Sequence, residues 1–227
     1  MNQQNTWARH LLQYYKELQP PARLPAHIEW LYPQQQPEVI DIVETFCHRF
    51  YNDSKERTLL LGINPGRFGA GITGVNFTAS KELEEDCGID NPFPKRSELS
   101  AEFIYKVIRA YGGVQAFYEH FFMGSVCPLG FVKNGKNINY YDDKELLQTV
   151  QPFIIRNLQR LLSFKVNRER VICIGGEKNY KYLSGLNEKY KWFETIDIVP
   201  HPRFIMQYRR KYLDEYIDQY LQVLEKK

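Results

Sequence analysis

Thr58-Leu59-Leu60-Leu61-Gly62-Ile63-Asn64-Pro65-Gly66 is the stretch of the chain that decides its fold. Its apolar residues run without alternation into a glycine, which is typical of a strand buried on both faces of a parallel sheet. The asparagine, proline and glycine that follow predict a tight turn, because proline fixes φ and glycine tolerates conformations that other residues avoid. We therefore expect a buried strand over residues 58–62 that opens into a glycine-rich loop over residues 64–80.

Three further apolar runs predict strands, and helical spacing of apolar residues predicts the helices between them. Strands that alternate with helices in this way indicate an α/β fold. We predict a three-layer α/β/α sandwich around a central four-stranded, mostly parallel sheet. The further strands are expected over residues 121–126, 171–174 and 195–199, and the helices over residues 6–18, 37–51, 98–111, 114–120 and 204–225.

Local patterns refine this arrangement. Asp142 and Glu145 have the spacing of a capping box, which indicates a helix that starts there and that Pro152 is expected to break. Residues 30–36 and 81–97 are rich in turn-forming residues and predict loops. The 227 residues fit a single domain, which we expect to carry a helical extension over about residues 1–52.

The composition is that of an ordinary globular protein, with 43% apolar and 25% charged residues. The formal net charge of +3 permits a nucleic-acid partner without requiring one. The four cysteines lie far apart, so we expect no metal site, and Cys47 and Cys173 are expected to be core thiols. Residues 1–5 do not resemble a leader and no apolar run reaches membrane-spanning length, so we predict a cytoplasmic protein without a membrane partner.

Three segments with unusual residues each follow a predicted strand: residues 62–66, 124–128 and 201–203. Taken alone, an Asn-Pro-Gly turn or a His-Pro pair is more often a simple turn. In parallel α/β sheets, however, ligands bind at the carboxyl ends of the strands, where these three segments are expected to meet. Their shared position therefore predicts one composite site.

The longer string from Gly62 to Phe77 reads G-x-N-P-G-x-F-G-x-x-x-T-G-x-x-F. It resembles the first motif of the single-strand-selective monofunctional uracil-DNA glycosylases, a branch of the uracil-DNA glycosylase superfamily. Cys127-Pro128-Leu129 resembles the end of that family's middle motif, and His201-Pro202 resembles its last motif. The chain is thus similar to a divergent, bacterial-type member of the superfamily.

The resemblance implies hydrolysis of the bond between a base and its sugar in DNA, the first step of base excision repair. Enzymes that act on a base take it out of the stack and into a pocket. By resemblance, Asn64 would orient the attacking water and His201 would stabilise the leaving base, without a cofactor or metal. The residues expected to bind the base are Gly62, Ile63, Phe68, Phe77 and Ser125.

The expected partner is DNA that contains a damaged or deaminated base, bound by a monomer. Residues 201–212 carry several basic and no acidic side chains, which suits contacts with phosphates. Apolar residues at the start of this segment could also wedge into the DNA where the base leaves. The residues expected to contact DNA are Gly66, Pro202, Arg203, Arg209 and Arg210.

Two positions depart from the family pattern. The family's middle motif carries an asparagine that reads the edge of the base, whereas Ser125 stands at that position here. A single hydroxyl cannot form the same bidentate contact, so uracil is the leading expected substrate and xanthine and hypoxanthine are open alternatives. The last motif usually reads His-Pro-Ser-Pro-Arg, whereas His201 is followed by Pro-Arg-Phe, which leaves the wedge geometry open.

Two other functions remain open from the sequence. One is a phosphate-binding α/β protein that uses the loop over residues 66–74, although both G-x-G-x-x-G and the lysine of a P-loop are missing there. The other is a non-catalytic protein on the same fold that binds damaged or single-stranded DNA. Substitution of Asn64 separates the enzyme from the binding protein, because only an enzyme has turnover to lose.

Overall fold

A four-stranded sheet with all strands parallel forms the centre of the protein in a computed structural model, which describes residues 5–96 and 98–226. The strand order is β3-β2-β6-β7, and the three pairings are all parallel. This confirms the predicted α/β fold and the predicted sheet. The strands are β2 (Arg57–Gly62), β3 (Phe121–Ser125), β6 (Val166–Ile174) and β7 (Thr195–Val199).

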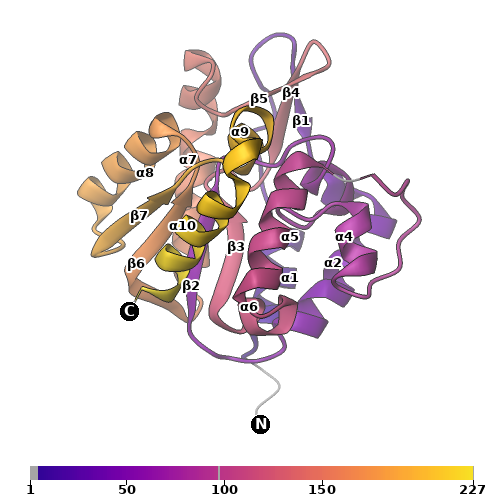
Figure 1. The fold of residues 1–227 in the computed structure, drawn as a ribbon. Helices are drawn as coiled ribbons and strands as arrows, with labels where there is room; N and C mark the ends of the chain where they lie inside the picture. The colour runs from indigo at the N-terminus through magenta and orange to yellow at the C-terminus, as the bar shows by residue number, and fades with distance from the viewer. Residues whose placement is uncertain (1–4, 97, 227) are drawn as a thin grey trace.

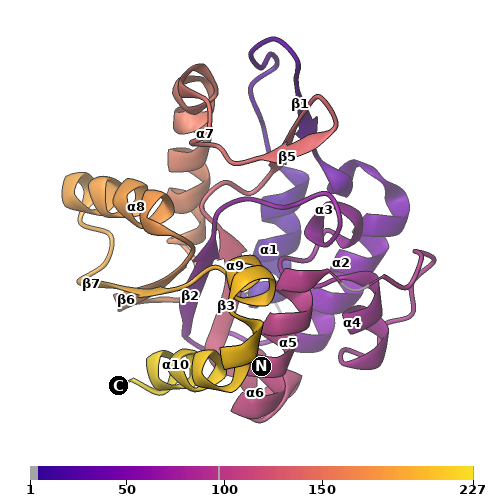
Figure 2. The same ribbon diagram turned by 45° about the horizontal axis from the view of Figure 1, so that its top comes forward.

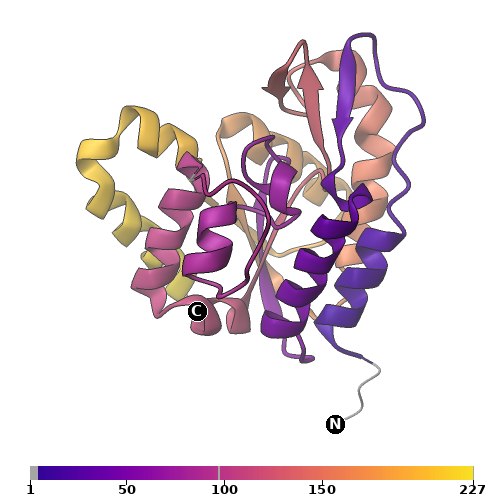
Figure 3. The same ribbon diagram turned by 90° about the vertical axis from the view of Figure 1, so that its right-hand side faces the viewer.

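Helices cover both faces of this sheet, which gives the three predicted layers (Figures 1 and 2). One layer contains α5 (Leu99–Tyr111), α6 (Val114–His120) and α10 (Leu213–Glu225). The other layer contains α1 (Trp7–Lys16), α2 (Pro37–Phe50), α7 (Lys144–Leu161) and α8 (Glu177–Tyr190). Figure 3 shows α5 and α10 on one side of the strands, with α1, α2 and α7 on the other.

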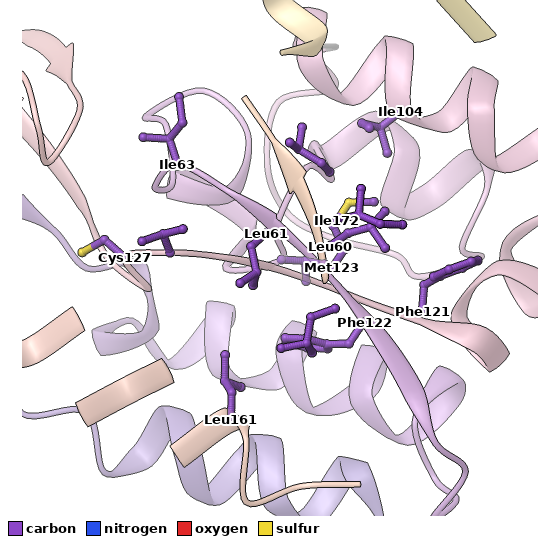
Figure 4. Close-up of a cluster of buried hydrophobic side chains, with 14 of the residues drawn as sticks. Leu60, Leu61, Ile63, Ile104, Phe121, Phe122, Met123, Cys127, Leu161 and Ile172 are labelled. Carbon is purple, nitrogen blue, oxygen red and sulfur yellow. The ribbon is translucent and has the colours of Figure 1, made fainter. Parts of the chain in front are cut away.

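The side chains of β2 alternate between two apolar layers, which explains why its sequence shows no polar face. Leu60 pairs with Met123 and Ile172, and Figure 4 shows this group on the side of Ile104 from α5. Neighbouring side chains of the strands point to the opposite face, where the Phe122 ring lies 5.5 Å from that of Trp7 in α1. A strand covered on both faces needs apolar residues at every position.

A second, antiparallel sheet was not predicted. It has the order β1-β4-β5 and consists of β1 (Ile28–Leu31), β4 (Gly130–Lys133) and β5 (Lys136–Ile138). It stands beyond the carboxyl ends of the parallel strands (Figure 1). Part of the predicted loop over residues 30–36 is therefore a strand, followed by the short 3-10 helix η1 (Pro33–Gln35). Strands of three or four residues are too short to show alternation, and β1 pairs with a segment far along the chain.

Several helix boundaries differ from the predictions. Asp143, and not Asp142, caps α7, because its side chain accepts hydrogen bonds from the amides of Glu145 and Leu146 at 3.0 and 3.1 Å. Pro152 lies inside α7 without ending it. Its position is exposed, so water can satisfy the carbonyl that loses its amide partner. The predicted loops also contain α3 (Ala70–Thr73) and α4 (Ser80–Glu85).

The predicted helix over residues 204–225 is divided. The chain forms α9 (Pro202–Tyr208), the 3-10 turn η2 (Arg210–Tyr212) and then α10. Helix α9 packs against α5, whereas α10 packs on both α5 and β7, so the chain must turn between them. Tyr208, Tyr212 and Tyr216 have the spacing of one helical face, but Tyr208 and Tyr212 lie on the surface because the helix is divided.

Other predictions concern single residues or the whole chain. All four cysteines are buried and free, which confirms that Cys47 and Cys173 are core thiols. Within the described residues, no helix is long and apolar enough to cross a membrane, and no cluster of histidine, cysteine and acidic side chains could hold a metal ion. The cytoplasmic location, the monomeric state and the extension over residues 1–52 stay predictions. Residues 1–4, 97 and 227 lie outside the described part of the chain.

Candidate active site

A cavity of about 370 Å³ lies at the carboxyl edge of the parallel sheet. Residues at or after the ends of the parallel strands β2, β3 and β7 line it, as expected for a composite site in an α/β fold. Among the residues predicted from the sequence, it gathers Ile63, Asn64, Gly66, Phe68, Phe77, Ser125, His201 and Arg203. The segments that line it come from the loop after β2, the end of β3, the segment after β5, the start of α5 and helix α9.

Asn64 is held at both ends of its side-chain amide. Its Oδ1 accepts a hydrogen bond from the backbone amide of Tyr140 at 3.0 Å, and its Nδ2 donates to the carbonyl of Ile138 at 3.3 Å. Ile138 ends β5 and Tyr140 lies two residues beyond it, so the unpredicted small sheet positions the predicted catalytic residue. Nδ2 also donates to the carbonyl of Pro65 at 3.4 Å, so both of its hydrogens have acceptors, whereas Oδ1 keeps one lone pair for a further partner.

The loop that carries Asn64 packs tightly against the small sheet. A Cβ atom on Gly130, the first residue of β4, would lie 2.2 Å from the carbonyl oxygen of Pro65, so only glycine fits there. The amide of Arg67 donates to Oδ1 of Asn137 at 3.2 Å, and the Arg67 guanidinium donates to the carbonyl of Gly135. The turn is thus fixed by contacts with residues 130–140 as well as by its own proline.

Phe77 stands at the end of the same loop with a positive φ of 53°, a conformation that is uncommon for a residue with a bulky side chain. Its ring lies against the end of β2, where a Cβ on Gly62 would come within 2.6 Å of it. Gly62 therefore does not line the cavity but makes room for Phe77. The Phe77 and His201 rings lie 6.2 Å apart, on opposite segments of the site.

His201 caps the amino end of α9. Its Nδ1 accepts a hydrogen bond from the amide of Arg203 at 3.1 Å, which requires that Nδ1 carry no proton. Burial, followed by the charge of Arg203, lowers the pKa of His201 from 6.5 to about 4. The neutral ring must therefore carry its proton on Nε2, which has no hydrogen-bond partner among the described residues. The hydroxyl of Tyr220 donates to the carbonyl of Pro200 and ties α10 to this turn.

Ser125 ends β3 and is almost fully buried. It lies beside Gly62 in the pairing of β2 with β3, which places it at the base of the cavity. Its hydroxyl donates to Oδ1 of Asn76 at 2.8 Å. Asn76 also lines the cavity, directly before Phe77, and we did not select it from the sequence. The signal that could have found it is its place inside the quoted motif, opposite a serine too short to reach a base.

Exposed aromatic side chains surround the opening. Phe68 and Phe204 are 45% and 43% exposed, and Tyr208 is 67% exposed, yet all three line the cavity. The guanidinium of Arg67 lies 4.5 Å from the Phe68 ring centroid, and that of Arg209 lies 5.4 Å from the Phe204 centroid. We call Phe68, Phe204 and Tyr208 the rim residues.

Three of the predicted DNA-contacting residues lie elsewhere. Pro202 is buried in the first turn of α9, so it is not placed to wedge into DNA, whereas the neighbouring Phe204 is exposed. Arg209 and Arg210 are exposed but do not line the cavity. A guanidinium nitrogen of Arg210 lies 3.5 Å from a carboxylate oxygen of Glu102.

Glu98 is the one acidic side chain among the described residues that line the cavity. It caps α5, and one of its oxygens accepts hydrogen bonds from the amides of Ser100 and Ala101 at 2.9 and 3.2 Å. Its other oxygen accepts from the Ser100 hydroxyl at 3.1 Å. The site therefore offers amides and a neutral imidazole facing its interior, and its carboxylate serves a helix cap.

This fold and this site define a class of protein. The family model "Uracil DNA glycosylase superfamily" matches residues 48–225, and the chain belongs to that superfamily. Among solved structures, the crystal structure of wild-type SMUG2 from Pedobacter heparinus is similar, with a TM-score of 0.94 and 41% identity over 97% of each chain.

Two curated relatives are also similar over part of their length. The single-strand selective monofunctional uracil DNA glycosylase of Mus musculus is 31% identical over 39% of this chain and 38% of its own. The corresponding enzyme of Rattus norvegicus is 29% identical over 49% of this chain and 48% of its own. The match with this chain thus spans less than half the length of either relative.

Proposed function

We propose that this protein is a monofunctional DNA glycosylase that hydrolyses the N-glycosidic bond of uracil in DNA, and of xanthine or hypoxanthine as alternatives. One observation carries the proposal: a neutral imidazole and a fixed asparagine amide line the same cavity. Membership of the superfamily and the names of the relatives support uracil as the leading substrate.

His201 would stabilise the base as it leaves. When the bond between C1′ of the sugar and the base nitrogen breaks, the electron pair goes to the base and negative charge spreads to its carbonyl oxygens. A hydrogen bond from Nε2–H of His201 to such an oxygen strengthens as that charge develops, which favours the transition state over the bound substrate. The contact with the Arg203 amide prepares this proton position before the base arrives.

Asn64 would hold the attacking water. The sugar left behind is cation-like, so the water needs orientation more than deprotonation, and an amide can supply it. The free lone pair on Oδ1 would accept one hydrogen of the water, whose oxygen then bonds to C1′ and whose proton passes to solvent. The contacts with Tyr140 and Ile138 fix the direction of that lone pair. Glu98, the one carboxylate among the described residues of the cavity, is engaged as a helix cap and is not needed as a base.

The remaining cavity residues would bind the extruded nucleotide. The Phe77 ring would stack on the base, and the backbone around Ile63 and Phe68 would close the sides of the pocket. The rim residues would stack on neighbouring bases, which suits single-stranded DNA because every base offers an aromatic face. The described residues that line the cavity include no lysine, so no Schiff base with the sugar is expected and the enzyme would be monofunctional.

The experiment that tests this proposal uses the purified chain in EDTA with labelled oligonucleotides that carry one uracil, xanthine or hypoxanthine. Hot alkali then cuts the DNA wherever a base has been lost. We expect cleavage of at least the uracil substrate by the wild-type protein and its loss in His201→Ala. If none of the three substrates is cleaved in single or double strands, the glycosylase proposal is wrong and a DNA-binding role replaces it.

A further inference from the structure

We infer that Asn76 reads the hydrogen-bonding edge of the base and that Ser125 positions it. The inference rests on the proposed function and concerns how the same pocket selects its substrate. Its starting point is the hydrogen bond of 2.8 Å between the Ser125 hydroxyl and Oδ1 of Asn76, at the inner end of the cavity.

The hydrogen bond gives the Asn76 amide a defined orientation. Ser125 is only 6% exposed, and its hydroxyl occupies one lone pair of Oδ1. The second lone pair of Oδ1 is left for a ligand, and Nδ2 has no hydrogen-bond partner among the described residues. Asn76 therefore presents one acceptor and one donor side by side, in a fixed order.

This pair matches the edge that deaminated bases share. Uracil, xanthine and hypoxanthine each present an N–H beside a C=O, so Oδ1 can accept from the N–H while Nδ2 donates to the C=O. Cytosine and adenine present a ring nitrogen acceptor beside an amino donor, which is the reverse pattern. An amide held in the order seen here would accept uracil and reject cytosine.

Other asparagines of the cavity are less suited to this role. Both ends of the Asn64 amide are engaged by Tyr140 and Ile138, and Oδ1 of Asn137 accepts from the Arg67 amide. The Asn139 side chain has no hydrogen bond to the described residues that would fix its orientation. Asn76 combines a fixed orientation and an unused donor with a place directly beside Phe77, whereas Asn137 lies on β5 against the Arg67 backbone.

Position along the chain also favours Asn76. It directly precedes Phe77, whose ring would stack on the face of the base. Adjacent residues on one loop can thus address the face and the edge of the same base. A serine in the middle motif then has a use: its short side chain leaves space for Asn76 and holds it in place.

The test compares single-turnover cleavage of single-stranded oligonucleotides that carry uracil or 3-methyluracil, in which a methyl group replaces the N–H that Oδ1 would accept from. We expect the wild-type protein to prefer uracil by about 100-fold, the discrimination typical of a bidentate contact. Asn76→Ala should slow uracil cleavage by about 100-fold while leaving the 3-methyluracil rate nearly unchanged, so that the preference disappears. Asn52→Ala, at an exposed asparagine before β2, is the matched control and should keep both rates.

Ser125→Ala tests the positioning role. It should reduce the preference for uracil by roughly tenfold, because the amide can then turn freely. Added to Asn76→Ala, it should have no further effect, since Ser125 acts through Asn76. Ser125→Thr, which keeps the hydroxyl, should restore the preference. If the two substitutions act additively, the positioning role is wrong.

A second variant of Asn76 and a binding measurement complete the test. Should Asn76→Ala fold poorly, the isosteric Asn76→Asp replaces the donor with a carboxylate oxygen that would face the C=O of uracil, and an unchanged uracil rate in it would overturn the inference. Full preference in Asn76→Ala, or its loss in Asn139→Ala instead, would also overturn it. If the wild-type protein cleaves nothing, the proposed function fails, but equilibrium binding of the same two oligonucleotides still measures the preference and its dependence on Asn76.

Discussion

The inner residues of the cavity and the rim residues differ in how they are held. The inner residues are Asn64, Asn76, Ser125 and His201; their side chains have hydrogen-bond partners inside the protein, and they are buried (Ser125) or half-buried. The rim residues are exposed aromatic rings that contact arginine guanidinium groups or one another, as where the Phe204 and Tyr208 ring centroids lie 5.8 Å apart. Chemistry requires fixed geometry, whereas binding a flexible strand tolerates adjustment.

The comparison predicts that inner substitutions slow the chemical step and rim substitutions weaken binding. The largest effect is expected for His201→Ala, which removes the donor to the leaving base. The single-turnover rate on uracil-containing DNA should fall by about 100- to 1000-fold, with DNA affinity nearly unchanged. His120→Ala, on the exposed end of α6, is the control. If His201→Ala instead lowers the affinity for DNA and leaves the rate unchanged, His201 contributes to DNA binding, as proposed for the rim residues, and not to the chemical step.

Asn64→Ala should have the next largest effect. It removes the group proposed to orient water and also leaves the Tyr140 amide without its partner. We expect a fall of about 100-fold in the single-turnover rate, since misplacement of a reactant by 1 Å costs that much. Hydrogen exchange at the Tyr140 amide should rise in the same variant. A normal rate with faster exchange would show that Asn64 holds the loop together but not the water.

The pH dependence of the rate separates a neutral from a charged imidazole. Since the pKa of His201 is lowered to about 4, the ring is neutral and donates from Nε2 throughout the neutral range, and the wild-type single-turnover rate should be flat from about pH 5.5 to 8. A rate that falls as pH rises through 6.5 would require a charged ring and contradict the assignment.

The same shift affects stability. The folded-state pKa lies below the unfolded value of 6.5, so the unfolded chain binds more protons as pH falls from 6.5 towards 4. The contribution of His201 to stability is therefore constant above pH 6.5 and declines below it. His201→Gln should flatten that part of the stability profile, measured by urea unfolding between about pH 4.5 and 7.

The sequence could predict the features of the site that depend on local patterns, but not those that depend on contacts between distant segments. The strand over residues 58–62 and the string that ends at Phe77 were predictable, because burial on both faces and a turn of Asn-Pro-Gly are local patterns. The small sheet that holds Asn64 was not, since its strands are short and pair across a long stretch of chain. The local pattern predicted the turn, and the resemblance to the glycosylase family selected Asn64, but neither indicated the partners that hold its side chain.

Other differences have equally local physical reasons. The bond between Ser125 and Asn76 depends on how two loops meet in space, which no spacing along the chain encodes. The break between α9 and α10 was missed because the tyrosines of residues 208–216 have helical spacing, although α9 and α10 pack on different elements. Exposure of Pro202 was also overestimated, because proline at the first turn of a helix can face the core.

Among the rim residues, Phe204 and Tyr208 should contribute to binding. Replacing both by alanine should raise the Kd for single-stranded DNA by roughly tenfold, with the single-turnover rate at saturation unchanged, because stacking is lost and the chemistry is not touched. Ile198→Ala, at a side chain on β7 with the same 43% exposure as Phe204, is the control. If the double variant binds single-stranded DNA as tightly as the wild type, Phe204 and Tyr208 do not contact the DNA.

The smallest effects are expected for the two arginines beyond the rim, and they test whether the DNA path continues past α9. Arg209 packs its guanidinium on Phe204 and has no acidic partner among the described residues, whereas Arg210 is paired with Glu102. An arginine that neutralises a phosphate releases a counterion, so its loss lowers the salt dependence of binding by about one unit of slope. Arg209→Gln should show that change with an affinity loss of a few-fold (about 1 kcal/mol), and Arg210→Gln should show less, because DNA must compete with Glu102 for it. Fluorescence anisotropy over a salt series measures the salt dependence of the Kd for each protein. Equal slopes in the wild type, Arg209→Gln and Arg210→Gln would show that neither arginine contacts a phosphate of the bound DNA.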